Sequence, residues 1–114
     1  MKILHEFVPT RKFLERAEEI KDLVDGWNVT DSAAGVPAPS GTAVSCVLKT
    51  KYPDKIVIPI FVLHYKSPVE AGGLALAADA MELDGIVLTM GDVPKYGEPL
   101  KMLKSSEEAR DFLR

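Results

Sequence analysis

Four short apolar segments, each followed by a stretch with helical spacing, constrain the fold of this chain more than any other feature. The expected strands start near residues 3, 28, 56 and 86, so they recur every 25 to 30 residues. Strand–helix units of this length, repeated in series, are typical of proteins in which right-handed crossovers connect parallel strands. The sequence therefore predicts the α/β class, with four βα units and parallel strands.

The third apolar segment is the clearest of the four. Residues 56–65, IVIPIFVLHY, are almost all apolar, which favours a strand buried on both faces, as in parallel sheets. Pro59 cannot donate a hydrogen bond to a sheet ladder, so we expect the strand to begin near Pro59 or to bend there. The other strands are expected at residues 3–8, 27–30 and 86–89.

Capping residues and glycines predict where the helices begin and end. Thr10 is expected to cap the first helix, and Gly26 is expected to stop it in the left-handed conformation. A second helix is expected at roughly residues 42–50. The third is expected to begin with a capping box at Ser67 and to end at Gly85.

Ser105 and Glu108 form another possible capping box, which would start a helix in the fourth unit. Two architectures accommodate four such units. One is a small doubly wound sheet, and the other is half of a TIM-type (β/α)₈ barrel. A compact flavodoxin-like domain would need more strands than the four that are visible. A complete barrel typically needs about 250 residues, so the 114 residues are expected to form a single domain, residues 1–114, that is a half-barrel.

Composition and charge narrow the classes of partner. The chain is 46% hydrophobic and 27% charged, with a net charge of −3 and no basic stripe, so nucleic acid is a poor partner. Its apolar runs are too short to span a membrane and its first residues do not resemble a signal peptide, so a cytoplasmic location is expected. Cys46 is the only cysteine, which excludes an intramolecular disulfide.

Polar side chains recur at or near the expected strand ends, where parallel βα proteins gather their chemistry. These residues are His5, Glu6, Thr30, Asp31, His64, Tyr65, Thr89, Gly91 and Asp92. Glu6 interrupts an apolar strand, so its carboxylate must be paired, exposed or functional, and burial would raise its pKa and suit it to general-acid work. Asp92 and Asp31 are also residues that commonly begin a turn, and the two histidines are expected to be ordinary edge or core residues.

Four motifs, in order, resemble the methylenetetrahydrofolate reductase family. The first is HEFVP, in which a glutamate is followed by an aromatic residue and a proline. The second is NVTD with an Ala/Gly/Pro-rich loop after it, and the fourth is LTMGDVP. They occupy residues 5–9, 28–31 and 88–94, and residues 59–68 resemble the third strand with the start of its helix. The resemblance covers about residues 3–99 and corresponds to the N-terminal half of the family's barrel.

The resemblance implies a (β/α)₈ barrel that holds FAD at the C-terminal face of its strands. It also implies that NAD(P)H or another electron donor supplies the reducing equivalents for converting the methylene group of a folate, or a related pterin, to methyl. Glu6 matches the general acid of the family, and Asp92 matches the carboxylate that stabilises developing positive charge. Thr30 matches a flavin-contacting position, and Asp31 and Gly91 are expected to bind the cofactor with Thr30 and Asp92.

Two positions and one larger feature depart from the family pattern. Ile60 stands where the family often has a histidine near the flavin, and Met90 stands where a basic residue sometimes precedes Gly-Asp. The chain has no counterpart of the later strands, which in the family contact much of the FAD and the pterin.

A half-barrel alone would leave two sheet edges unpaired and an apolar interior exposed. We therefore expect a homodimer, or a partner chain, that covers the open edges. An alternative function is a non-catalytic binding or partner subunit that needs a second polypeptide to complete the barrel.

Overall fold

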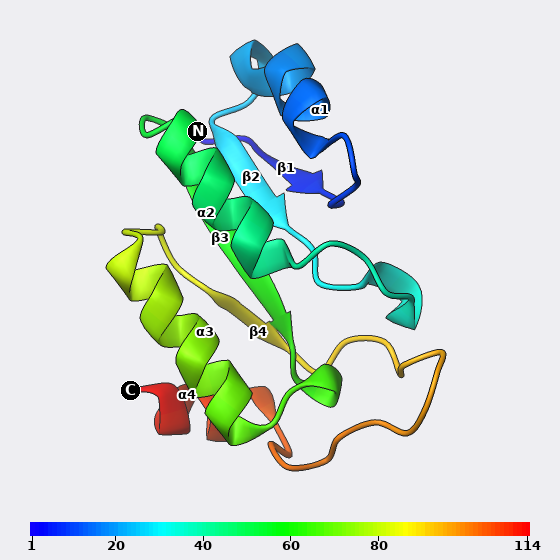
Figure 1. Cartoon of the computed structure of the whole chain (residues 1–114). Helices are drawn as coiled ribbons and strands as arrows, with labels where there is room; N and C mark the ends of the chain where they lie inside the picture. Colours follow the sequence, from blue (N-terminus) through cyan, green and yellow to red (C-terminus); the bar gives the residue numbers. More distant parts are fainter.

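A computed structural model describes the whole chain, Met1–Arg114, as four parallel strands and four helices in alternation (Figure 1). The strands are β1 (Leu4–Phe7), β2 (Gly26–Val29), β3 (Ile56–Val62) and β4 (Val87–Thr89). The helices are α1 (Phe13–Ile20), α2 (Gly41–Lys51), α3 (Pro68–Ala80) and α4 (Ser106–Leu113). Short 3-10 turns lie at Lys21–Leu23, Ala33–Gly35 and Leu63–Tyr65. The predicted α/β class and βα order are confirmed.

The strands lie across the sheet in chain order, β1-β2-β3-β4, and every neighbouring pair is parallel. A doubly wound sheet reverses its strand order at one point, and this sheet does not. Each helix contacts the next one along the chain, α1 with α2, α2 with α3 and α3 with α4. The helices therefore follow the same order as the strands.

Apolar side chains from one face of the sheet form the core together with the helices. Trp27 and Val57 are fully buried against α1 and α2, and the half-buried Leu88 packs against a cluster that contains residues of α3 and α4. The registers place these three side chains on the same face of the sheet. Each large apolar side chain buried in this way stabilises the fold by about 1.5–3 kcal/mol.

The opposite face of the sheet is not covered by any helix. It carries Leu4, Ile58, Ile60 and Val87 at the alternate positions of three strands, and all four side chains are half-buried or exposed. Side chains of neighbouring residues in a strand point to opposite faces, so one face is buried beneath the helices and the other stays open.

The C-terminal ends of the strands are staggered relative to the rows of paired residues. Phe7 at the end of β1 lies opposite Val29, and Val29 lies opposite Pro59 in β3. β3 continues for three residues beyond Pro59, to Val62, which lies opposite Thr89 at the end of β4. Closing a sheet into a barrel requires a stagger of this kind.

Pro59 lies inside β3, so the expectation that the strand begins there is wrong. The ladder between β2 and β3 ends at the pair Val29–Pro59, and the ladder between β3 and β4 begins at the next residue, with Ile60 opposite Val87. Pro59 therefore lies where the strand changes its partner, a position at which the missing N–H costs least.

Gly26 is the first residue of β2 and does not stop α1, which ends at Ile20. A Cβ at Gly26 would overlap the carbonyl oxygen of Ile56, so glycine is needed because β3 passes so closely. Glu82, rather than Gly85, takes the left-handed conformation after α3, with φ 57°.

The predicted helix caps are confirmed for α3 and α4 but not for α1. The Ser67 and Ser105 hydroxyls accept hydrogen bonds from the backbone N–H groups of Glu70 and Glu108, at 3.2 and 3.0 Å. Helix α1 has no side-chain cap, and Thr10 instead accepts a turn hydrogen bond at its carbonyl from the Phe13 N–H.

Candidate functional site

One cavity of about 150 Å³ lies at the C-terminal ends of the strands. Loops that follow β2 and β4 form its rim, and the open face of the sheet forms its floor. It is lined by Glu6, Thr30, Asp31, Ser32, Ala33, Ile60, Val62, Tyr65, Gly91 and Asp92. All five residues that the sequence suggested for catalysis or cofactor binding are in this set, and we call this cavity the strand-exit pocket.

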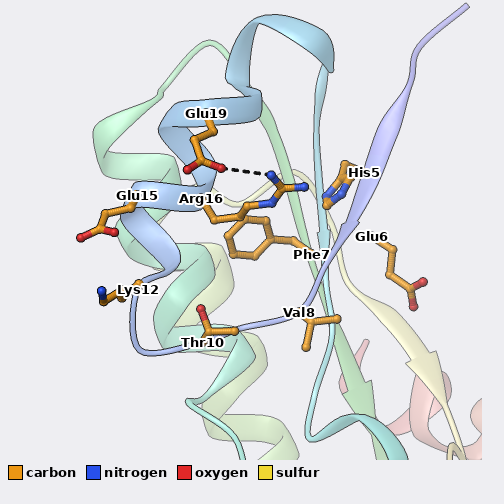
Figure 2. A pocket seen from close by; sticks show the side chains of 9 residues that line it. All are labelled: His5, Glu6, Phe7, Val8, Thr10, Lys12, Glu15, Arg16 and Glu19. Atoms are coloured by element: carbon orange, nitrogen blue, oxygen red, sulfur yellow. Dashed lines mark hydrogen bonds and ion pairs between the residues drawn. The ribbon is translucent and has the colours of Figure 1, made fainter.

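Glu6 lines the strand-exit pocket from the edge strand β1, and its side chain is exposed rather than buried. Figure 2 shows Glu6 on the side of β1 opposite to His5 and Phe7, which point toward α1. The alternation along the strand places Glu6 on the open face, and no helix covers that face. The Glu6 carboxylate is therefore accessible from the open face at the strand exits.

Thr30 follows β2 and is the most deeply buried polar residue of the strand-exit pocket. Its backbone N–H donates a hydrogen bond to the Phe7 carbonyl at 2.9 Å, which extends the ladder with β1. The residue is 6% exposed, and its hydroxyl Oγ1 has no hydrogen-bond partner. A buried hydroxyl without a partner costs about 1–3 kcal/mol, so a ligand that bonds to it would recover this cost.

Asp31 uses its carboxylate within the protein. Its Oδ2 accepts hydrogen bonds from the Lys66 ammonium and from the Val62 N–H, the latter at 3.1 Å. Lys66 is itself buried and lies over the Phe61 ring, 5.9 Å from its centroid. Asp31 therefore ties the end of β2 to the end of β3, and Lys66 largely balances its charge.

Gly91 and Asp92 form the rim above β4. Gly91 has φ +70°, and a Cβ at this position would lie 2.5 Å from Cγ1 of Val62. The Asp92 carboxylate accepts a hydrogen bond from the Ala34 N–H at 3.1 Å. Asp92 therefore links the segment after β4 to the loop after β2.

The loop after β2 is strained where it meets this rim. Ser32 and Ala34 have positive φ values of 45° and 60°, which residues other than glycine rarely adopt. Gly35 follows with φ +74°, and its carbonyl accepts a hydrogen bond from the Lys95 N–H at 2.9 Å. Strain of about 1–3 kcal/mol at each such residue persists only where neighbours hold it, and it is commonly found beside functional sites.

Tyr65 belongs to the strand-exit pocket, although sequence reasoning placed it only among the polar residues at strand ends. Its hydroxyl lies 3.5 Å from the Ser32 carbonyl oxygen. Burial raises the pKa of Tyr65, and the nearby carboxylates of Asp92 and Asp31 raise this pKa further. The hydroxyl donates its hydrogen bond to the Ser32 carbonyl, so its oxygen can accept a hydrogen bond from a ligand. The position of Tyr65 just after β3 was the signal in the sequence.

Three larger hollows adjoin other parts of the fold, and two of them share residues with the strand-exit pocket. One of about 400 Å³ shares Asp31, Ser32 and Tyr65 with the strand-exit pocket and extends between the loops. The other, of about 370 Å³, is a groove between β1 and α1, and Figure 2 shows the side chains that line it. We call the second hollow the β1–α1 groove. His5 lies in this groove and not in the strand-exit pocket.

His64 is also outside the strand-exit pocket, so the histidines do not join the carboxylates. Its backbone carbonyl accepts a hydrogen bond from the Leu100 N–H at 2.7 Å, which holds the segment before α4. No three His, Cys, Asp or Glu side chains gather closely enough to hold a metal ion. No helix is long and apolar enough to cross a membrane.

Comparison with known proteins identifies no relative. No protein-family model, curated protein or solved structure matches the chain. The geometry of the strand-exit pocket and the motif resemblance are therefore the features that bear on function.

Proposed function

We propose that this chain forms the N-terminal half of a methylenetetrahydrofolate reductase-like (β/α)₈ barrel. The completed barrel reduces a methylene-tetrahydrofolate, or a related pterin, to the methyl form. The single observation that supports this most is the strand-exit pocket, because Glu6, Thr30 and Asp92 come from three separate motifs and line one cavity.

Three features of the sheet support the barrel. Its strands keep chain order without a reversal, its strand ends are staggered, and no helix covers one of its faces. In a barrel, helices cover the outer face only, and the inner face meets the inner faces of the other strands.

FAD would supply the hydride chemistry, with NAD(P)H or another donor supplying the electrons. The pocket suits one end of such a group, because the Thr30 hydroxyl has no hydrogen-bond partner and Gly91 has no side chain. The cavity of about 150 Å³ is smaller than ligand pockets of about 300–1,000 Å³. The missing half of the barrel would have to provide the remaining walls.

Each carboxylate has a role that its surroundings suit. Glu6 is accessible on the open face, where it can deliver a proton to a substrate nitrogen as the methylene bridge opens. Asp92 is held in place by the Ala34 N–H, so its negative charge is fixed where it favours a cationic form of the substrate.

A flavin titration tests the proposal. We expect FAD fluorescence to change on addition of the protein, and Thr30→Val to weaken binding by about 2- to 13-fold, since one net hydrogen bond is worth about 0.5–1.5 kcal/mol. Glu6→Gln is expected to keep FAD binding but to lose reduction of methylene-tetrahydrofolate. Protein that has no flavin absorbance and does not bind added FAD is not this enzyme.

A non-catalytic partner subunit is the second candidate. The observation that favours it is Asp31, whose carboxylate is occupied by Lys66 and the Val62 N–H instead of facing a ligand. In that case the chain co-purifies with a polypeptide that carries the other half of the barrel. Glu6→Gln would then leave the activity of the complex unchanged.

A further inference from the structure

The two edge strands have outer sides that are unpaired. β1 pairs only with β2, and β4 pairs only with β3. Apolar side chains are exposed on both edges, Leu4 at 37% and Val87 at 38%. Unpaired edges of this kind are templates for further strand pairing.

The open face between these edges also lacks partners. Ile58 and Ile60 are only half-buried, although their neighbours Val57 and Phe61 on the helix-covered face are fully buried. The side-chain oxygen of Asn28 is buried on the open face and has no hydrogen-bond partner. The face has the composition of a barrel interior, with apolar side chains toward the middle and polar groups toward the strand exits.

We propose that two copies of this chain pair through these edges and close an eight-stranded parallel barrel around a two-fold axis. β4 of each copy then lies beside β1 of the other. A two-fold axis along the barrel keeps all strands parallel and brings both sets of strand exits to the same end. The interface is two-fold symmetric, because β4 of the first copy meets β1 of the second and β4 of the second meets β1 of the first.

The stagger of the strand ends supports a second copy of the chain as the partner that covers the open face. In a barrel of shear eight, the strand ends shift by about four residues along the strand direction in each half of the barrel. In this sheet the strand ends already shift by three residues, from Pro59 to Val62. Continuing to a shift of about four places Leu4 of one copy opposite Val87 of the other, and Glu6 opposite Thr89. Both pairs then join side chains that point to the same, inward face. Each chain therefore supplies both of the strands, β1 and β4, that pair when the barrel closes.

The β1–α1 groove provides the place for the partner's helix. Each helix contacts its successor, so the next helix in the ring after α4 would be α1 of the other copy. The groove of about 370 Å³ lies on this outer side of α1, and it contains the buried His5 Nδ1, which has no hydrogen-bond partner. Charged side chains of both signs, including Arg16 and Glu19, line the same groove.

Closure would also complete the strand-exit pocket. Glu6 of one copy would lie beside Thr89 of the other, three residues before that copy's Asp92. Each Glu6 already shares a strand-exit pocket with Asp92 of its own copy, and closure would place it beside the β4 exit of the partner as well. The inference uses the barrel geometry of the proposed function but not its chemistry, so a dimer that binds no flavin would contradict only the enzyme proposal.

Cross-linking between the edges tests the pairing. In a Cys46→Ala background, the double variant Leu4→Cys, Val87→Cys is expected to oxidise to a covalent dimer of twice the chain mass. Neighbouring parallel strands bring Cα atoms to about 5 Å, within the range for disulfides. Each single variant is expected to stay uncross-linked, because the two copies of either residue lie on opposite sides of the barrel.

Sedimentation of the unmodified chain provides a second measurement that does not depend on the cysteines. We expect a dimer at micromolar concentration, and loss of this dimer in Val87→Lys. Leu76→Lys, on the exposed face of α3 at 73% exposure, is the matched control and should remain dimeric. A monomeric wild-type chain, equal cross-linking by a single variant, or assembly only with a different co-expressed chain would overturn the proposal.

Discussion

Gly91 is a residue at which conformation and space both require glycine. Its φ of +70° is unfavourable for any residue with a Cβ, and Val62 occupies the place of that Cβ. Gly97, in the same long connection to α4, has a similar φ of +78° but open space around it. The two glycines therefore separate the cost of strain from the cost of crowding.

Substituting the two glycines is expected to have unequal effects. Gly97→Ala should lower the free energy of unfolding by about 1 kcal/mol through strain alone. Gly91→Ala should lower it by about 1–3 kcal/mol more, because Val62 must also move. Urea unfolding of both variants measures the difference, and equal losses would show that Val62 yields without cost.

The two aspartates of the strand-exit pocket show how position decides what a carboxylate can do. Asp31 faces a buried lysine that balances its charge, whereas Asp92 is exposed and accepts one backbone hydrogen bond. A ligand with developing positive charge would therefore respond mainly to Asp92. Asp31 fixes the geometry on which the pocket depends.

Among the elements, α1 and α2 are joined by a polar contact at the end opposite to the pocket. Tyr52, just after α2, donates a hydrogen bond to the Glu18 carboxylate on α1, and its ring packs against Trp27. Burial, and then the hydrogen bond and the negative charge of Glu18, raise the pKa of Tyr52 to about 12. The phenol must stay protonated to make this contact.

This contact predicts a loss of stability at alkaline pH. The folded-state pKa of Tyr52 lies above its ordinary value of 10.0, so its contribution is complete below pH 10 and falls as the pH rises to about 12. The stability difference between wild type and Tyr52→Phe should therefore shrink over this range. A Glu18→Gln variant should titrate Tyr52 at lower pH by absorbance, and an unchanged titration would exclude Glu18 as a cause.

The sequence predicted elements well where a local pattern decides the structure. Ser67 and Ser105 identify the starts of α3 and α4, because a hydroxyl at the cap satisfies a backbone N–H of its own first turn. Gly26 misled the prediction, since its role depends on Ile56 of another strand. Pro59 misled it for the same reason, because the change of partner strand is not visible in local sequence.

The candidate site was likewise predictable only where the strand order decides the position of a residue. A parallel sheet brings all strand exits together, so Glu6, Thr30 and Asp92 could be expected in one place from strand order alone. Neither the exposure of Glu6 nor the ion pair between Asp31 and Lys66 could be predicted, because each depends on the neighbouring chain segment. Tyr65 could be placed near the site but not within it.

On the scale of the whole molecule, helices cover one face of the sheet and leave the other face open. Fully buried side chains such as Trp27 and Phe61 lie under the helices, while Leu4 and Val87 remain exposed at the two edges. The helix-covered core gives a single chain its stability. Closure of the open face by a second copy, as we propose, would bury these side chains and add to that stability.

Thermal stability should therefore depend on protein concentration. A folded dimer that unfolds to separate chains becomes more stable as concentration rises, because mass action favours the associated state. We expect Tm to rise by several degrees between micromolar and high micromolar protein, given roughly 4–8 °C per kcal/mol for a domain of this size. Val87→Lys should remove this dependence and Leu76→Lys should keep it. A wild-type Tm that does not change with concentration would mean that the open face contributes nothing to stability by self-association.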